Sequence, residues 1–331
     1  MTLIFIPMMT RETHIPLSRR AVLAGLAAFA ATPALAASKL NIVATTGMIA
    51  DMVRAVGGDA VSVQGLMGAG VDPHAYRQTR SDIVAMTRAD ATLWHGLYLE
   101  AQMEAFFADL ARKRPVHAGA ETLDPSLLRS HEDYDGRYDP HIWMDPTLWV
   151  QIVPAVVDAL SALRPDARAT FEANAATYSS EADALAIYAR DTLAAVQPAR
   201  RVLLTAHDAF GYFGAAYDFE VLGIQGISTE SEAGLNRIST LVDLLVDRDL
   251  PAVFVETSVS DRNIRALVEG AAARGHTVSI GGSLFSDAMG PDSTYEGTWL
   301  GMIDHYVTTI ARALGADVPA TGRLGKLKGA A

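Results

Sequence analysis

The chain has 331 residues, with 38 acidic and 27 basic side chains and no cysteine. Its formal net charge of −11 argues against nucleic acid or an anionic membrane surface as a partner and mildly favours cations. The lack of cysteine excludes disulfide bonds, thiolate metal ligands and a cysteine nucleophile.

The first 36 residues have the pattern of an export signal peptide. Ser18-Arg19-Arg20 precedes an apolar run that ends in Ala34-Leu35-Ala36, an A-x-A cleavage site. The run is too short to span a bilayer as a stable helix, and the paired arginines suggest twin-arginine export, with the Sec route as the alternative. Cleavage after Ala36 predicts a soluble periplasmic protein, because no cysteine is available there to carry a lipid anchor.

Short runs rich in β-branched residues alternate with helical patterns along the rest of the chain. Helical patterns at 48–56 and 79–88 lie between the early runs. Strands that alternate with helices predict parallel sheets built from βαβ units. We therefore predict an α/β fold of two lobes, each with a four-stranded, mostly parallel sheet. The predicted strands are 40–46, 61–67, 91–96 and 115–119 in the first lobe, and 202–207, 219–225, 252–258 and 277–282 in the second.

Two helices are predicted between the lobes. The helix at 147–163 breaks near Arg164-Pro165, and 166–196 then runs without glycine or proline. Asp166 is placed to cap the start of this second helix, and Pro198 prevents much continuation. So long a helix predicts a rigid strut that resists wide hinge closure. The predicted organisation is an N-terminal lobe (37–165), a connecting helix (166–197) and a C-terminal lobe (198–331). The polar, acidic stretch 121–140 is predicted to be a surface loop.

The phrases VDPHAY (71–76) and YDPHIW (138–143) each place a histidine directly after Asp-Pro. The sequences that flank the two phrases differ too much for the phrases to be copies of an internal repeat. His74 follows one predicted strand, His141 lies beyond another, His207 ends a third, and Asp287 follows a fourth. Because ligands of open parallel sheets bind beyond the carboxyl ends of strands, these four side chains converge if the lobes face each other.

Three imidazoles and a carboxylate form a ligand set for a divalent transition metal. The set suits Zn²⁺ in tetrahedral geometry, or Mn²⁺ if Asp287 binds through both oxygens. The alternative is that both Asp-Pro pairs only form turns, with the histidines hydrogen-bonded nearby. The other histidines are expected to be ordinary, and His95 is expected to be hydrogen-bonded in a lobe core. These others are His14, His95, His117, His131, His276 and His305.

Long stretches of the chain, including VATTGMIADMV, GLMGAGVDPHAY, DPHIWMDP and IGGSLFSDAMG, carry a family resemblance. The chain resembles the metal-binding solute receptors of bacterial zinc/manganese ABC importers, the TroA-like cluster. The resemblance covers essentially the whole mature chain. It implies two α/β lobes, one long connecting helix and one metal ion per chain, held by His74, His141, His207 and Asp287.

Two details bear on the cargo that this resemblance implies. His207 stands where some manganese receptors of the family have glutamate, and the set of three histidines and one aspartate is seen in receptors that take zinc or both ions. Many zinc-dedicated receptors have a long His-rich loop before the second ligand, whereas 121–140 contains only His131. The cargo is therefore predicted to be zinc or manganese, with the choice open.

The main competing function is an exported zinc-dependent hydrolase. Catalytic zinc usually keeps three protein ligands and an open position, whereas four protein ligands close the shell. Neither an H-E-x-x-H nor a G-x-S-x-G motif is present, and Glu230 and Glu232 fit a helix N-terminal role better than that of a general base. A receptor for a siderophore or corrinoid would need an aromatic or arginine-lined cleft. An adhesin role would depend on surface patches that a sequence does not reveal.

The preferred prediction is a monomeric binding protein, not an enzyme, that captures one metal ion and delivers it to the membrane permease of an ABC importer. Because imidazole must be neutral to bind a metal, affinity is expected to collapse below about pH 6 for histidines of ordinary pKa.

Overall fold

The computed structural model describes residues 38–130, 136–230 and 234–328. The predicted signal peptide (1–36), His131 and Glu232 lie outside the described residues.

The first lobe is built on one parallel sheet with strand order β2-β1-β3-β4. The β-branched residues Ile42 and Val43 lie on the central strand β1 and are buried, so both faces of the sheet must be covered. The elements are β1 (Leu40–Ala44), α2 (Gly47–Gly57), β2 (Val61–Gly65), α3 (Arg80–Arg88), β3 (Ala91–Trp94), α4 (Glu104–Ala111) and β4 (Val116–Ala118).

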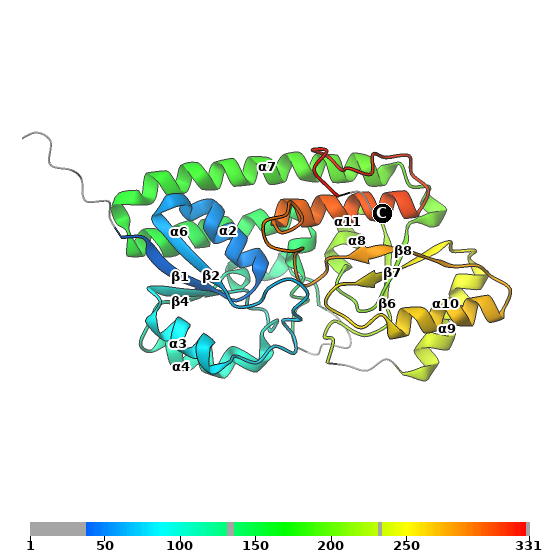
Figure 1. Cartoon of the computed structure of the whole chain (residues 1–331), viewed down its shortest axis with the longest axis horizontal. Coiled ribbons are helices and arrows are strands. Elements are labelled where there is room, and N and C mark those ends of the chain that lie inside the picture. The colour runs from blue at the N-terminus through cyan, green and yellow to red at the C-terminus, as the bar shows by residue number, and fades with distance from the viewer. Residues whose placement is uncertain (1–37, 131–135, 231–233, 329–331) are drawn as a thin grey trace, which may run out of the picture. The chain divides into compact units, whose positions relative to one another are not determined.

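Helices cover both faces of this sheet (Figure 1). Helix α2 and the later helix α6 (Val153–Leu163) pack on one face, in a large apolar cluster that includes Ile42. On the other face, Val43 packs with Met86 of α3 and Phe107 of α4. The arrangement confirms the predicted βαβ organisation and leaves the carboxyl ends of the strands as the place where loops gather.

The second lobe contains two parallel strand pairs, β5-β6 and β7-β8. Strands β5 and β7 lie side by side, but among the described residues no ladder of backbone hydrogen bonds joins them. The predicted single four-stranded sheet is thus found as two adjacent pairs. The elements are β5 (Val202–Thr205), α8 (Gly211–Tyr217), β6 (Glu220–Gly223), α9 (Leu235–Asp247), β7 (Ala252–Glu256), α10 (Arg262–Ala273), β8 (Ser279–Leu284) and α11 (Trp299–Ala313).

The connection between the lobes is a short α5 (Pro146–Trp149), α6, and then the long α7 (Arg168–Ala194). Helix α7 has 27 residues, or about 40 Å at 1.5 Å per residue. It packs against α2 and α6 of the first lobe and against α11 of the second, which confirms the long helix (Figure 1). The predicted cap by Asp166 is wrong, because Asp166 lies in a 3₁₀ turn and Ala167 occupies the N-cap.

Short 3₁₀ helices occupy many of the turns. They are η1 (Gly58–Ala60), η2 (Ala101–Met103), η3 (Ala120–Thr122), η4 (Pro125–Leu127), η5 (Ile142–Met144), η6 (Val150–Ile152), η7 (Pro165–Ala167) and η8 (Pro198–Arg200).

One apolar cluster extends through both lobes. Trp143 and Trp149 of the first lobe pack with Trp299 and Tyr306 of α11, and all four side chains are fully buried. Hydrogen bonds fix the contact: the Trp299 indole N–H donates to the Trp143 carbonyl at 3.2 Å, and the Tyr306 hydroxyl donates to the Met144 carbonyl at 3.0 Å. The two lobes therefore share a core.

The segment Pro146–Leu163 is long and apolar enough to cross a membrane by length and composition alone. It is interrupted by η6, and α6 packs against α2 and α7. These contacts are those of a core helix.

Candidate metal centre

His74 lies in the loop that follows β2. The loop stays bonded to β1 for two residues past the strand, since the amides of Leu66 and Met67 donate to Ala44 and Thr45. The His74 amide donates to Asp72 Oδ1 at 2.9 Å, so the Asp-Pro-His phrase closes on itself in a tight turn. This turn brings the imidazole inward, where only 2% of the residue is exposed.

His141 lies in the second Asp-Pro-His turn. Asp139 Oδ1 accepts both the His141 amide, at 3.0 Å, and the ring Nδ1–H, at 2.7 Å. The Nδ1 proton is thereby fixed, and Nε2 is left as the free ring nitrogen. The Trp143 indole lies beside this ring, with 5.2 Å between centroids.

His207 and Asp287 come from the second lobe, just beyond the ends of β5 and β8. The His207 amide donates to Glu256 Oε1 at 2.9 Å, and its Nδ1 contacts Glu256 Oε2 at 2.6 Å. Glu256 is the last residue of β7, the strand beside β5. Asp287 is held by its neighbour Ser286, whose carbonyl accepts the Trp143 indole N–H at 2.8 Å.

The structure brings these four side chains together. One ligand atom from each of His74, His141, His207 and Asp287 lies within 4.8 Å of the others, and all four residues are buried. The Nε2 atoms of His74 and His141 are 3.3 Å apart. Asp287 Oδ1 lies 3.4 Å from His141 Nε2, and Oδ2 lies 3.1 Å from His207 Nε2.

Both Asp287 oxygens and His207 Nε2 lack a hydrogen bond of acceptable geometry with any residue that the structure describes. Leaving buried polar atoms unsatisfied costs about 1–3 kcal/mol each. A group of orphaned donor atoms that face one another is the signature of a site that a cation completes, so the four residues could hold one metal ion.

Comparison with known proteins agrees with this geometry. Residues 42–313 match the family described as "Zinc-uptake complex component A periplasmic". The chain belongs to this family.

Individual relatives match over most of their length. The "Zinc-binding protein TroA" of Treponema pallidum is 44% identical over 287 residues, which cover 87% of this chain and 92% of TroA. The "Manganese-binding lipoprotein MntA" of Bacillus subtilis is 42% identical over 276 residues, which cover 83% of this chain and 90% of MntA. The solved structure of the periplasmic zinc-binding protein TroA superposes with a TM-score of 0.81, covering 84% of this chain and 99% of TroA.

Buried charges set the protonation of the site in this family member. Burial lowers the pKa of His141, but the carboxylates of Asp139 and Asp287 outweigh it and raise the pKa to about 9. Burial also lowers the pKa of His207, and the charges of Asp287 and Glu256 outweigh it to raise the pKa well above 6.5. His74 has no such compensation: burial lowers its pKa to about 3, against a weaker opposing effect of Asp287.

Asp287 is held in its charged form by the same neighbours. Burial alone would raise its pKa, but the positive charges of His207 and His141 bring that pKa well below 3.8. Without metal, these shifts favour the charged forms of Asp287, His141 and His207 and the neutral form of His74.

The other described histidines lie outside this group. His95 is fully buried and its Nε2–H donates to the Pro140 carbonyl at 2.7 Å, directly behind the His141 turn. It thus has the core role expected for it. His276 donates to the Leu250 carbonyl at 2.9 Å, while His117 lies on β4 and His305 on α11.

Sequence reasoning missed two residues of the site, Asp139 and Glu256. Asp139 belongs to the phrase YDPHIW, in which the Asp-Pro pattern by itself predicts only a turn. Glu256 is a buried acid at the end of an apolar strand, in AVFVE, and that unusual placement was the available signal. Such carboxylates orient metal-binding histidines and raise their basicity.

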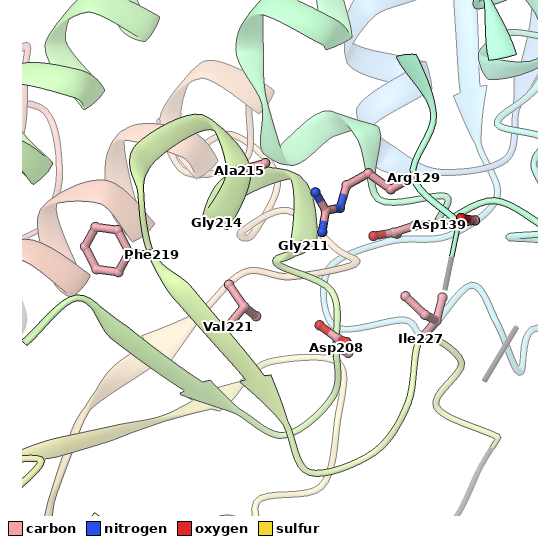
Figure 2. A pocket seen from close by; sticks show the side chains of 10 residues that line it. Arg129, Asp139, Asp208, Gly211, Gly214, Ala215, Phe219, Val221 and Ile227 are labelled. Atoms are coloured by element: carbon pink, nitrogen blue, oxygen red, sulfur yellow. The ribbon is translucent and has the colours of Figure 1, made fainter. Parts of the chain in front are cut away.

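A cavity of about 390 Å³ lies on the far side of Asp139 (Figure 2). Figure 2 shows Arg129 and Asp139 beside the start of α8 at Gly211, and Asp208 and Ser130 add polar side chains to the lining of the cavity. None of His74, His141, His207 and Asp287 is among the lining residues. The cavity reaches the carboxylate behind His141, not the position between the four ligand atoms.

Proposed function

We propose that this protein is the extracytoplasmic solute-binding component of an ABC importer and that its cargo is a divalent transition metal, Zn²⁺ or Mn²⁺. The observation that carries the proposal is the buried convergence of three histidines and one aspartate from both lobes. Family membership and the similarity to TroA and MntA, one named as zinc-binding and one as manganese-binding, support the same conclusion.

The spacing of the ligand atoms supports four-coordinate binding. In a tetrahedron the ligand–ligand distance is about 1.63 times the bond length, so Zn–N bonds of about 2.0–2.1 Å require about 3.3–3.4 Å between ligands. Three distances fall close to this value: 3.3 Å between His74 and His141, 3.4 Å between His141 and Asp287 Oδ1, and 3.1 Å between His207 and Asp287 Oδ2. His74 lies 3.9 Å from Asp287 Oδ2, and the whole set lies within 4.8 Å, so a bound ion would draw the ligands slightly closer together. Because both Asp287 oxygens face the site, a five-coordinate Mn²⁺ complex is also open to it.

The same geometry supports binding over catalysis. A catalytic zinc needs an open coordination position and room for a substrate, whereas His141 and His207 are fully buried and four protein ligands complete the shell. Glu230, once considered as a base, is an exposed residue whose carboxylate accepts from Gln102. None of the family and relative names points to a hydrolase.

We further propose that the protein acts in the periplasm as a monomer and hands its ion to a membrane permease. All four proposed ligands come from one chain, so a second copy is not needed to complete the site. Some relatives are named lipoproteins, but none of the 331 residues here is a cysteine, which favours a soluble form. We also propose that residues 37–165 form the N-terminal lobe and residues 198–331 the C-terminal lobe, with the connecting helix between them. Release of the protein by osmotic shock without detergent would test its location.

The decisive experiment is elemental analysis of the purified protein, followed by calorimetric competition of Zn²⁺ and Mn²⁺ on the demetallated form. We expect one equivalent of metal, lost in His207→Ala. His117→Ala is the matched control, because it removes an imidazole that lies outside the cluster. Failure of the wild-type protein to bind either ion, or full binding by His207→Ala, would overturn the proposal.

A further inference from the structure

The side chains of Thr229 and Glu230, in the second lobe, contact the first lobe. The Thr229 hydroxyl donates to Asp72 Oδ2 at 2.6 Å. The Gln102 side-chain amide donates to the Glu230 carboxylate, at 3.1 and 3.2 Å to its two oxygens. The metal proposal gives these contacts no role.

Thr229 is connected to the proposed ligand His74 through one intervening residue, Asp72. Asp72 uses its other oxygen, Oδ1, to accept the His74 amide at 2.9 Å. Asp72 thus joins the His74 turn to the opposite lobe. Gly70, with φ of +73°, precedes it, and a Cβ there would lie 3.4 Å from the Thr257 carbonyl of the second lobe. The His74 loop therefore lies directly against the second lobe.

The second Asp-Pro-His turn is held differently. Asp139 directs one oxygen, Oδ1, to both the amide and the ring of its own histidine, His141. Its contact with the second lobe runs through its backbone carbonyl, which accepts the Tyr212 hydroxyl at 2.9 Å. Among the hydrogen bonds of the described residues, the aspartate side chain of the first turn joins the two lobes, whereas that of the second turn bonds its own histidine.

Hydrogen bonds continue from Thr229 to the segment that carries His207. The Gln225 side-chain amide donates to the Thr229 carbonyl at 3.3 Å, and the Gln225 backbone amide donates to Ala206 at 3.0 Å. The Asp208 amide donates to Gly226 at 3.2 Å. A continuous series of contacts therefore joins the neighbours of His207 to Thr229, Thr229 to Asp72, and Asp72 to His74.

We propose that Thr229 is a positioning residue for the metal site: by bonding Asp72 it fixes His74 of one lobe relative to His207 of the other, and so sets how long a bound metal stays. This inference rests on the proposed function, since it concerns the lifetime of that same complex. The His141 and His207 rings each contact a carboxylate of their own lobe, Asp139 and Glu256, whereas the Asp72 that holds the His74 turn is itself bonded to the opposite lobe. Loss of the bond loosens His74, whose ring lies farther from a carboxylate oxygen, 3.9 Å, than the 2.7 and 2.6 Å of the His141 and His207 rings, so the metal is released from that side.

The test uses three substitutions of Thr229 in the full chain. Thr229→Val is close to isosteric and removes the donor, Thr229→Ala also removes it, and Thr229→Ser keeps the hydroxyl. Zn²⁺-loaded protein is mixed with excess chelator in a stopped-flow instrument and the dissociation rate is measured. Residues that act through a metal ligand typically change affinity by about 10–100-fold. We expect dissociation to be faster by about that factor in the Val and Ala variants, with association changed far less, and the Ser variant to return to within about threefold of wild type.

A second readout does not require metal. Hydrogen exchange of the His74 amide in the demetallated protein should be faster in Thr229→Val and Thr229→Ala than in Thr229→Ser, because the amide's acceptor Asp72 is no longer fixed. Glu230→Gln, which alters the neighbouring exposed contact, is the matched control and should leave both measurements near wild type.

Wild-type dissociation in the Val and Ala variants would overturn the inference while leaving the proposed function intact. Fast dissociation in the Ser variant would also overturn it, since the hydroxyl would then not be the group that matters. Absence of metal binding by the wild-type protein in the same assay would overturn the proposed function and this inference together.

Discussion

Metal binding should release about two protons at pH 7.5, because two of the three imidazoles are charged before the ion arrives. The pKa of His141 is raised to about 9 and that of His207 well above 6.5, whereas that of His74 is lowered to about 3. Coordination needs all three rings neutral, so the ion must displace one proton from each of the first two and none from the third.

The number of protons released distinguishes the shifted pKa values from ordinary histidine pKa values. Two protons released per ion make the apparent affinity fall about 100-fold for each unit of pH, or ~2.7 kcal/mol at 1.36 kcal/mol per proton and pH unit. Three histidines of ordinary pKa near 6.5 would together release only about 0.3 protons at pH 7.5, and their affinity would fall only below about pH 6. The buried carboxylates therefore move the loss of affinity to higher pH.

The assay is calorimetry of Zn²⁺ binding at pH 7.5 in buffers that differ in their ionisation enthalpy, which gives the number of protons released. Asp139→Asn is the informative variant, because it removes the charge that most raises the pKa of His141 and should bring the release from about two towards one. Release of fewer than one proton by the wild-type protein would refute the reasoning.

Three further outcomes follow from the site. Glu256→Gln should weaken Zn²⁺ binding by about 10–100-fold, because the Glu256 carboxylate contacts both the backbone amide and the ring of His207. Unchanged affinity in competition titrations would contradict this. Asp287→Asn removes a proposed ligand and its charge, so it should weaken binding more than Glu256→Gln does, and the reverse order in the same titration would count against Asp287 as a ligand. Demetallated protein should be most stable near pH 6.5. His141, with its folded pKa of about 9, contributes stability that is present below about 6.5 and is lost as the pH rises through 9. His74, with its folded pKa of about 3, must stay neutral in the fold while the unfolded chain takes up a proton, so stability is also lost as the pH falls below about 6.5. Thermal unfolding in the presence of chelator checks the loss of stability on both sides of pH 6.5. A steady rise in stability up to pH 9 would contradict this prediction.

The sequence predicted the parts of this molecule that depend on short-range pattern. Alternating strands and helices predicted the α/β class, the two lobes and the long helix, and the rule that ligands gather beyond strand ends placed His74 and Asp287 in one group. The structure brings the four residues together; that they bind metal stays a prediction. Family resemblance strengthened the ligand assignment but gave no partner for any ring nitrogen.

Asp139 acts on His141 from two positions away, but two other residues that sequence reasoning missed act through contacts between segments far apart in the chain. Glu256 meets His207 from 49 positions away, and Thr229 meets Asp72 from 157 positions away. No periodic or local signal marks such a meeting, because it depends on how strands and loops pack. The error at Asp166 is local instead, since a 3₁₀ turn starting at Pro165 displaced the helix start that propensity favoured.

The core shared by the two lobes determines how the protein unfolds. Lobes joined only by a linker unfold in separate steps, each with its own midpoint. Here Trp143 and Trp149 lose their packing partners if α11 unfolds, and Trp299 loses the Trp143 carbonyl that its indole bonds. Neither half retains an intact interior without the other, so heating should give one cooperative transition. An ion bound between the lobes then raises the midpoint of the whole molecule, and the shift grows with the concentration of free metal.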